Sequence, residues 1–297
     1  MTATPLKVIA RIKGGLGNQL FCYAAARRLA VVNNAELVID DVTGFSRDRL
    51  YRRNYSLDVF DIPARKATPA ERLAPFERAR RGIAKFIASR KPFDKRRYIV
   101  QEGYDFDERL LRLRLDHEVY LDGLWQGEGY FKDIEETLRR DLTFQEPTDD
   151  ANRAMAPRML GPRAVSVHVR WFDVEPAQGV NNVAAQYYRN AIERMEAIAP
   201  KGEYFVFSDF PERVRDVLGL PEDRYVVVSH NKGDAKAYAD MWLMTKCAKH
   251  ITANSTFSWW GAWLSSAPKK VVICPGVHSI QANWNFRGLV PDAWVRL

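Results

Sequence analysis

The sequence has few cysteines and no long apolar run. Its 297 residues contain three cysteines, Cys22, Cys247 and Cys274. An odd number of widely separated thiols offers neither a disulfide framework nor the paired spacing of a zinc site, so a reducing compartment is the simplest expectation. No segment approaches the roughly 18 apolar residues that a membrane-spanning helix needs, and residues 1–5 do not resemble a signal peptide. We expect a cytoplasmic protein that is soluble or attached to a membrane only at its periphery.

The common nucleotide-binding motifs are also absent. The glycine-rich segment GGLGNQ, residues 14–19, has Asn18 and Gln19 where a P-loop would carry Lys followed by Ser or Thr. Leu20 takes the place of the last glycine of a dinucleotide-binding fingerprint. Because Asn and Gln are neutral hydrogen-bonding groups, they suit hydroxyls better than a pyrophosphate. We name Asn18, Gln19 and the preceding Gly17 as candidate substrate contacts; the alternative is that the glycines only form a tight turn.

Basic side chains outnumber acidic ones, and one segment holds much of the excess. The chain has 45 Lys and Arg against 37 Asp and Glu, which favours phosphorylated partners; charge alone would support nucleic acid, and we expect none. Residues 65–97 contain twelve Lys and Arg but three acids, and they carry an apolar stripe at helical spacing, formed by Leu73, Phe76, Ile83, Phe86 and Ile87. Such a helix can contact an anionic membrane or an acidic acceptor, but more commonly its stripe is buried in the core.

Hydrophobic periodicity predicts two α/β domains. Residues 6–12, 20–32 and 37–39 read as a strand, a helix and a strand, with the glycines at the first turn. The proline-containing segment 143–162 lacks a sustained pattern, and we place the boundary there, between domains 1–150 and 151–297. In the second domain short apolar runs alternate with helical patterns; the runs are 165–169, 204–207, 225–228, 251–253 and 271–273. This alternation predicts a doubly wound parallel sheet.

Polar groups follow several of these predicted strands, and ligands bind such sheets at the carboxyl ends of the strands. His168, Arg170 and Asp173 follow the first strand, and residues 254–258 follow the fourth. Arg170 offers a permanently charged fork for phosphate oxygens, while His168 and Asp240 could hydrogen-bond a purine edge. Each has an ordinary alternative: a core histidine, a salt-bridged arginine and a helix-capping aspartate.

The stretch 254–263, with the sequence NSTFSWWGAW, is the most distinctive part of the chain. It reads as a hydroxyl-rich turn that opens a helix, where unpaired N–H groups and the helix dipole favour an anion such as phosphate. The candidate contacts are Ser255, Thr256, Phe257 and Ser258. In the alternative reading, Ser255 or Thr256 is an ordinary N-cap; the tryptophans are most simply core residues.

Several motifs together resemble a known family. They are, in order, residues 14–21 (GGLGNQLF), 123–126 (GLWQ), 165–170 (VSVHVR), 205–209 (FVFSD) and 254–264 (NSTFSWWGAWL). This set is similar to the α-1,2-fucosyltransferases of glycosyltransferase family 11, and the resemblance extends from residue 8 to about residue 275.

The resemblance implies an inverting, metal-independent enzyme of the GT-B type, with two Rossmann-like doubly wound domains facing a cleft. Such an enzyme would move L-fucose from GDP-fucose to a sugar hydroxyl, often a galactose 2-OH, of a bacterial glycan. The N-terminal domain would take the acceptor and the C-terminal domain the GDP-fucose, with no cofactor or metal. By motif, His168 and Asp240 would contact guanine and Arg170 the β-phosphate. Residues 256–258 would contact the pyrophosphate, and Asn18 would lie near the reacting bond. The resemblance thus implies Arg170, Asp173 and Asn18 as catalytic residues.

One departure separates this chain from the family pattern. The family usually reads His-Val-Arg-Arg-Gly-Asp, whereas this chain has Trp171 and Phe172 in place of the second arginine and the glycine. Asp173 matches the family acid and is our candidate general base, with Glu175 nearby. Two other readings stay open: a transferase for another GDP-sugar, and a nucleotide-sugar-binding protein that has lost catalysis through the change at Trp171.

Overall fold

The computed structural model describes residues 5–46, 48–49, 51–172, 182–276 and 287–297. The chain forms two compact units, one made of Met1–Thr143 with Phe286–Leu289 and the other of Phe144–Asn285 with Val290–Leu297. The change from one unit to the other after Thr143 lies inside the proline-containing segment where the sequence predicted a boundary at residue 150. No sequence pattern indicates that residues near the C-terminus return to the first unit. No helix among the described residues is long and apolar enough to cross a membrane.

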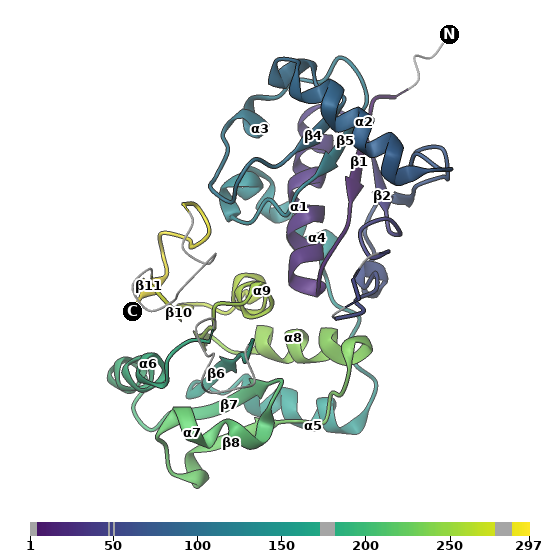
Figure 1. The fold of residues 1–297 in the computed structure, drawn as a ribbon. Coiled ribbons are helices and arrows are strands. Elements are labelled where there is room, and N and C mark those ends of the chain that lie inside the picture. The colour runs from purple at the N-terminus through teal and green to yellow at the C-terminus, as the bar shows by residue number, and fades with distance from the viewer. Residues whose placement is uncertain (1–4, 47, 50, 173–181, 277–286) are drawn as a thin grey trace. The chain divides into compact units, whose positions relative to one another are not determined.

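The first unit is built on a five-stranded parallel sheet with the order β3-β2-β1-β5-β4 (Figure 1). Its strands are β1 (Lys7–Arg11), β2 (Glu36–Asp40), β3 (Arg65–Lys66), β4 (Tyr98–Val100) and β5 (Val119–Asp122). Its α-helices are α1 (Leu16–Val32), α2 (Glu77–Ser89), α3 (Arg109–Arg112) and α4 (Glu135–Asp141). The predicted strand-helix-strand opening is present, but α1 begins at Leu16 rather than residue 20. Gly14, at φ +78°, makes the turn, and Gly15 is the N-cap, so Asn18 and Gln19 lie in the first turn of the helix.

Helix α2 is present as predicted, but its apolar stripe does not face the core. The other face of the helix packs on the sheet. The small residues Ala84 and Ala88 pack on the core cluster that Tyr98 and Tyr120 help to form. The large apolar residues at positions 83, 86 and 87 are exposed instead. The prediction that this stripe lies in the core is therefore wrong, except for Leu73, which packs against that cluster.

The second unit is built on a six-stranded parallel sheet with the order β11-β10-β9-β6-β7-β8. Its strands are β6 (Ala164–Val169), β7 (Glu203–Ser208), β8 (Tyr225–Val228), β9 (Lys249–Ile251), β10 (Val271–Cys274) and β11 (Val295–Arg296). Its α-helices are α5 (Asp150–Met159), α6 (Ala185–Ile198), α7 (Arg215–Leu218), α8 (Ala237–Lys246) and α9 (Thr256–Leu264). The predicted doubly wound sheet is confirmed. Helix α5 and strand β11 were not predicted.

Both faces of this second sheet are covered. Side chains alternate along a strand, and Val165 and Val167 of β6 pack into a cluster with α6 and α7. The neighbouring Ala164 packs into a second cluster with α5 and α8. Strand β6 lies between β9 and β7, so the carboxyl ends of these three strands are adjacent. This edge is where the predicted site residues follow their strands.

The tryptophans of α9 are core residues, as the sequence predicted. Trp259, Trp260 and Trp263 are buried, and their rings contact one another, with centroids 5.1 to 6.2 Å apart. Trp294, which precedes β11, adds a fourth ring 5.4 Å from Trp259. This aromatic packing fixes α9 and therefore the place of its N-terminal turn.

Candidate active site

His168 is a buried, neutral histidine near the end of β6. Its ring lies 5.7 Å from that of Phe257 in the first turn of α9, which joins two predicted site residues across adjacent strand ends. Burial, with a smaller contribution from the charge of Arg170, lowers its pKa to about 3. Its Nδ1 is buried and has no hydrogen-bond partner in the described part of the chain. A neutral imidazole can both donate and accept, which suits a base edge.

Arg170 is held at the end of β6 by Asp209, which follows β7. The Arg170 Nη1 atom lies 2.9 Å from Asp209 Oδ2, and Asp209 Oδ1 accepts a hydrogen bond of 3.1 Å from the backbone of Trp171. The salt bridge that the sequence offered as the alternative for Arg170 is therefore present. This salt bridge does not use all five N–H donors of the guanidinium, and the Arg170 side chain is partly exposed. Asp209 orients the guanidinium because it contacts both that group and the backbone N–H of Trp171.

The two residues that depart from the family pattern have structural roles. Trp171 packs against the core beneath α6 and α7, and the guanidinium of Arg213 lies 4.0 Å from the centre of its ring. Phe172 lies 5.1 Å from the guanidinium of Arg170. Its backbone N–H donates to Asn182 at 2.7 Å. These contacts pack Trp171 and Phe172 in place without a second arginine.

The start of α9 is a capped helix N-terminus. Ser255 is the N-cap and accepts from the backbone of Phe257 at 3.3 Å. The Ser258 hydroxyl donates to the Ser255 carbonyl at 3.3 Å and accepts from the Ala253 backbone at 3.2 Å. Both serine hydroxyls are thus engaged within the turn, so these residues can meet an anion chiefly through backbone donors and the helix dipole. Thr256 is half-buried, and its hydroxyl has no partner within the described residues.

Asp240 lies in the first turn of α8 and belongs to a polar network. Asn231, in the loop after β8, donates to its carboxylate at 2.8 Å. Burial raises the pKa of Asp240 to about 7, against the lowering effect of the Asn231 hydrogen bond. Asn231 exchanges hydrogen bonds of 2.8 and 3.0 Å with the fully buried Asn152 of α5. Asn152 also donates to the N-cap Asp149 at 2.9 and 3.0 Å.

This network is a part of the site that sequence reasoning missed. Helix α5 was not predicted, and single asparagines carry no motif. The described contacts do not join Asp240 directly to His168, so the two predicted guanine contacts are each positioned by separate neighbours.

In the first unit, Asn18 pairs with a residue the sequence did not single out as a site residue. Gln126, in the loop after β5, donates to Asn18 Oδ1 at 2.9 Å. Gly127, at φ +142°, shapes that loop, and a Cβ there would lie 2.5 Å from the Gly288 carbonyl. The family motif at 123–126 contained this signal. Asn18 and Gln126 thus present two neutral amides at the carboxyl edge of the first sheet.

Gln19 and Gly17, which the sequence named as candidate substrate contacts, are both buried in the first turn of α1. The Gln19 side chain is fully buried. It donates to the carbonyls of Gly14 and Asn54 at 2.8 Å and accepts from the Ser56 backbone at 2.8 Å. It therefore holds the segment around residue 54 against α1. Gly17 is buried within the first turn of α1.

A cluster of charges at the end of β5 also escaped sequence reasoning. Asp122 is buried and lies 3.2, 3.0 and 2.9 Å from cationic nitrogens of Arg11, Lys13 and Lys85. Burial alone would raise the pKa of Asp122, but Lys13, Arg11 and Lys85 together hold it well below its usual range. The carboxylate is therefore ionised at neutral pH, and it ties α2 to the sheet through Lys85.

The chain matches a known protein family over most of its length. The family model described as "Glycosyl transferase family 11" matches residues 7–282. The chain belongs to glycosyltransferase family 11. It is therefore a glycosyltransferase, and the sequence resemblance is confirmed.

Relatives in family 11 cover almost the whole chain. The chain is 29% identical over 303 residues to an Escherichia coli protein named alpha-1,2-colitosyltransferase. The alignment covers 98% of this chain and 98% of that protein. It is 28% identical over 309 residues to the E. coli O-antigen biosynthesis glycosyltransferase WbnK, with 96% of this chain and 99% of that protein covered.

Solved structures show that the fold is GT-B. NodZ α-1,6-fucosyltransferase, in a crystal soaked with GDP-fucose, matches with a TM-score of 0.53 at 22% identity, over 88% of this chain and 93% of that one. Arabidopsis thaliana FUT1, in complex with GDP, matches with a TM-score of 0.55 at 13% identity, over 95% and 72%. The predicted GT-B class, with two parallel α/β sheets, is confirmed.

The candidate bases Asp173 and Glu175 lie outside the described residues. Within the described ranges, no group of three or more His, Cys, Asp or Glu could hold a metal ion. The chain does contain an Asp-x-Asp sequence, at Asp105 and Asp107, but both side chains make other contacts. Asp107 pairs with Arg109 at 2.7 Å, and Asp105 accepts from the Arg287 backbone at 2.8 Å.

Proposed function

We propose that this protein is an inverting, metal-independent fucosyltransferase that moves L-fucose from GDP-fucose to a sugar hydroxyl of a bacterial glycan. The proposed acceptor hydroxyl is the galactose 2-OH. One observation carries this proposal. Arg170, fixed by Asp209 at the end of β6, lies at the same sheet edge as the N-terminus of α9, which follows the adjacent strand β9. A guanidinium and a helix N-terminus are both attractive to a diphosphate.

The departing diphosphate is the centre of the proposed mechanism. When the bond between fucose C1 and the β-phosphate oxygen breaks, negative charge grows on GDP. Arg170 and the backbone donors at residues 256–258 are in place before the reaction, so they stabilise that charge without reorganisation. This positive charge does the work that a metal ion does in other transferases, which is the basis for proposing metal independence.

Guanine recognition is assigned to Asp240 and His168. The N1–H and exocyclic amino group of guanine are both donors, and an ionised carboxylate accepts two hydrogen bonds side by side. Asn231 donates to Asp240 at 2.8 Å and so orients the carboxylate. The buried Nδ1 of His168, which lacks a partner in the described part of the protein, is available to the base or to its sugar.

The acceptor is assigned to the first unit. The amides of Asn18 and Gln126, joined at 2.9 Å, suit the hydroxyl groups of a sugar. The acceptor oxygen attacks fucose C1 opposite to GDP, which converts the β-linked donor into an α-linked product. Its proton passes to a base, for which Asp173 remains our candidate.

A cytoplasmic location is also part of the proposal. Three free, buried thiols, Cys22, Cys247 and Cys274, are consistent with a reducing compartment.

The proposed nucleotide-sugar donor is supported by a structural neighbour. The crystal of NodZ was soaked with GDP-fucose.

The deciding experiment is product analysis. The purified protein is incubated with GDP-fucose and a panel of galactosides, and the linkage of any product is determined by NMR. We expect an α-1,2-fucosylated galactose and one GDP for each fucose transferred. Binding of GDP-fucose without transfer or hydrolysis across the panel would instead identify a nucleotide-sugar-binding protein without catalysis.

A second donor has a specific observation in its favour. The relative at 29% identity is named a colitosyltransferase, and colitose is L-fucose without its 3-hydroxyl. Competition between GDP-fucose and GDP-colitose in one reaction distinguishes the two. A kcat/KM at least tenfold higher for GDP-colitose would replace fucose with its 3-deoxy counterpart and leave the roles of Arg170 and Asp240 unchanged.

A further inference from the structure

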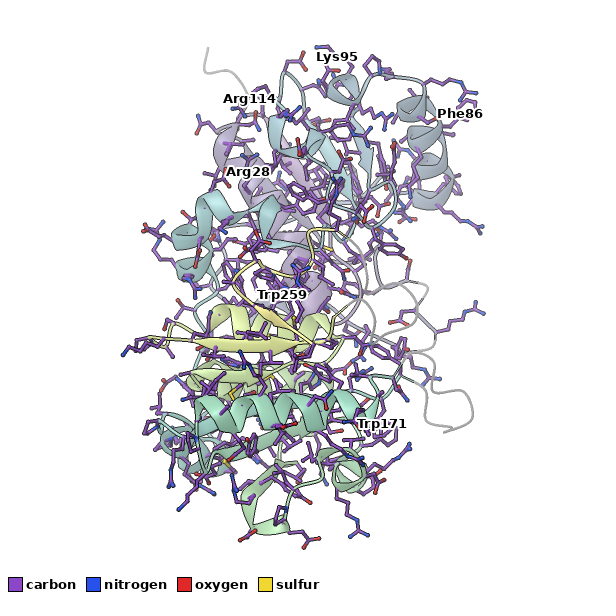
Figure 2. All side chains as sticks on the ribbon, turned by 90° about the vertical axis from the view of Figure 1, so that its left-hand side faces the viewer. Arg28, Phe86, Lys95, Arg114, Trp171 and Trp259 are labelled. Carbon is purple, nitrogen blue, oxygen red and sulfur yellow. The ribbon has the colours of Figure 1, made fainter. Side chains whose placement is uncertain are left out.

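Helix α2 presents its large apolar side chains to solvent. Phe76, at the N-cap, is 78% exposed, and Ile83, Phe86 and Ile87 are 59%, 59% and 49% exposed. Figure 2 shows Phe86 on the outer side of this helix. The last three residues have the i, i+3, i+4 spacing of one helix face. Single exposed apolar residues are ordinary, but a contiguous apolar stripe marks an interaction site.

The opposite face of α2 makes the contacts that hold the helix on its sheet. Ala84 and Ala88 pack on the sheet, and Lys85 reaches the buried Asp122 at 2.9 Å. The helix packs on its sheet through these alanines and one ion pair, so Ile83, Phe86 and Ile87 are left available to another partner. The exposed stripe is therefore not needed for contact with its own sheet.

Basic side chains flank the stripe, and they are not neutralised. Among the described residues, Arg78, Arg80, Arg90 and Lys91 have no ion-pair partner. Lys95 and Arg96, just beyond them, pair with Asp116 and Glu102 at 3.0 and 2.7 Å. Most of the unpaired charge in residues 65–97 therefore lies on the helix and at its C-terminal end.

Charge and apolar surface are closest at the end of α2. The guanidinium of Arg90 lies 3.4 Å from the centre of the Phe86 ring. Arg80, at the other end, donates to the carbonyl of Ala74 at 2.8 Å, which fixes the turn that carries Phe76. The surface thus combines an apolar ridge with fixed cations beside it.

We propose that this α2 surface, Phe76, Ile83, Phe86 and Ile87 with Arg78, Arg80, Arg90 and Lys91, docks on an anionic lipid bilayer. A helix that buries an apolar face at the headgroup boundary and carries Arg or Lys beside it is the usual interfacial anchor. Nucleic acid would use the cations but leave the isoleucines and phenylalanines exposed to water. The sequence prediction of membrane contact through residues 65–97 is thereby narrowed to residues 76–91. The docking does not depend on the donor or acceptor assigned to the enzyme.

The first test uses site-directed labelling. All three native cysteines are buried, so Phe86→Cys provides a selectively reactive thiol for an environment-sensitive fluorophore. The matched control is Leu160→Cys, at an exposed leucine of the second unit. We expect a blue shift at position 86 on vesicles of phosphatidylcholine containing about one-third phosphatidylglycerol. No shift is expected on phosphatidylcholine alone or at position 160. Equal responses at both positions, or none at position 86, would refute the proposal.

The second test measures binding by cosedimentation with the same vesicles. The variant Ile83→Ser/Phe86→Ser/Ile87→Ser should bind at least tenfold more weakly than wild type, as should Arg78→Gln/Arg90→Gln/Lys91→Gln, while Leu160→Ser is unchanged. Thermal melts show that each variant is folded, and Phe86→Ser alone serves if the triple variant is not. Binding by wild type should weaken as salt is raised. A wild type that ignores vesicles but forms a concentration-dependent dimer, lost in the serine variant, would assign the surface to a second copy instead.

Discussion

At the residue scale, Arg170 carries the largest expected effect on the rate. Arg170→Ala removes the fixed charge that Asp209 holds at the end of β6. We expect a loss of at least about 2 kcal/mol of transition-state stabilisation, or more than tenfold in kcat. Steady-state kinetics measure it, with Arg215→Ala as the control because Arg215 is largely exposed. Turnover within twofold of wild type would remove Arg170 from the mechanism.

Asp240 should make donor binding depend on pH. Burial raises its pKa to about 7 in the free protein, so the carboxylate that accepts from guanine forms only as the pH rises through that value. We expect the Kd for GDP to improve between pH 6 and pH 8. Asp240→Asn should weaken GDP at least tenfold at pH 8, since hydrogen bonds to a charged group are involved, and should flatten the pH dependence. Calorimetric titration measures both, and a pH-independent wild type would contradict the assignment.

The same residue should oppose stability. A carboxyl whose folded pKa lies above its unfolded value binds more protons when folded, so stability falls as pH rises from the unfolded value, near 4, toward 7. At pH 8 the ionised, buried Asp240 therefore costs stability. Asp240→Asn should have a higher Tm than wild type at pH 8 and a smaller difference at pH 5. A lower Tm at pH 8 would show that Asn231 and its neighbours more than offset the burial of the charge.

At the element scale, the loop after β5 depends on a glycine. A Cβ at Gly127, where φ is +142°, would approach the Gly288 carbonyl to 2.5 Å. Gly127→Ala should lower the free energy of unfolding by about 1–3 kcal/mol and reduce activity through displacement of Gln126. The matched control is Gly82→Ala, in the interior of α2 with open space around its Cβ, which should stabilise by about 0.5–1 kcal/mol. Urea unfolding measures both, and equal signs would refute the steric argument.

The elements also show where sequence patterns lose information. Periodicity predicted α2 from its stripe, but it could not say which face meets the sheet, because Ala84 and Ala88 carry little hydrophobic signal while Phe86 carries much. Packing decided in favour of the small residues. Helix α5 was hidden by the proline at position 157, which lies inside the helix.

At the scale of the whole molecule, the proposed mechanism makes one prediction about ions. Because Arg170 and the start of α9 supply the positive charge, EDTA should leave the transfer rate within twofold of the untreated value. The measurement is GDP release with and without added Mg²⁺ or Mn²⁺ after exhaustive chelation. Strict dependence on a divalent ion would overturn the metal-free mechanism while leaving family membership intact.

The sequence by itself determined the α/β class, the parallel second sheet and the family, because strand and helix periods and contiguous motifs are local properties of the chain. It also placed Arg170 and residues 254–258 at strand ends, since parallel strands share one carboxyl edge. Only the tertiary structure showed that Gln19 is buried and holds the segment around residue 54 against α1. It likewise revealed that Asn152 and Asn231 position Asp240, and that α2 turns Phe86 outward. These facts depend on contacts between residues far apart in the chain, which no local pattern encodes.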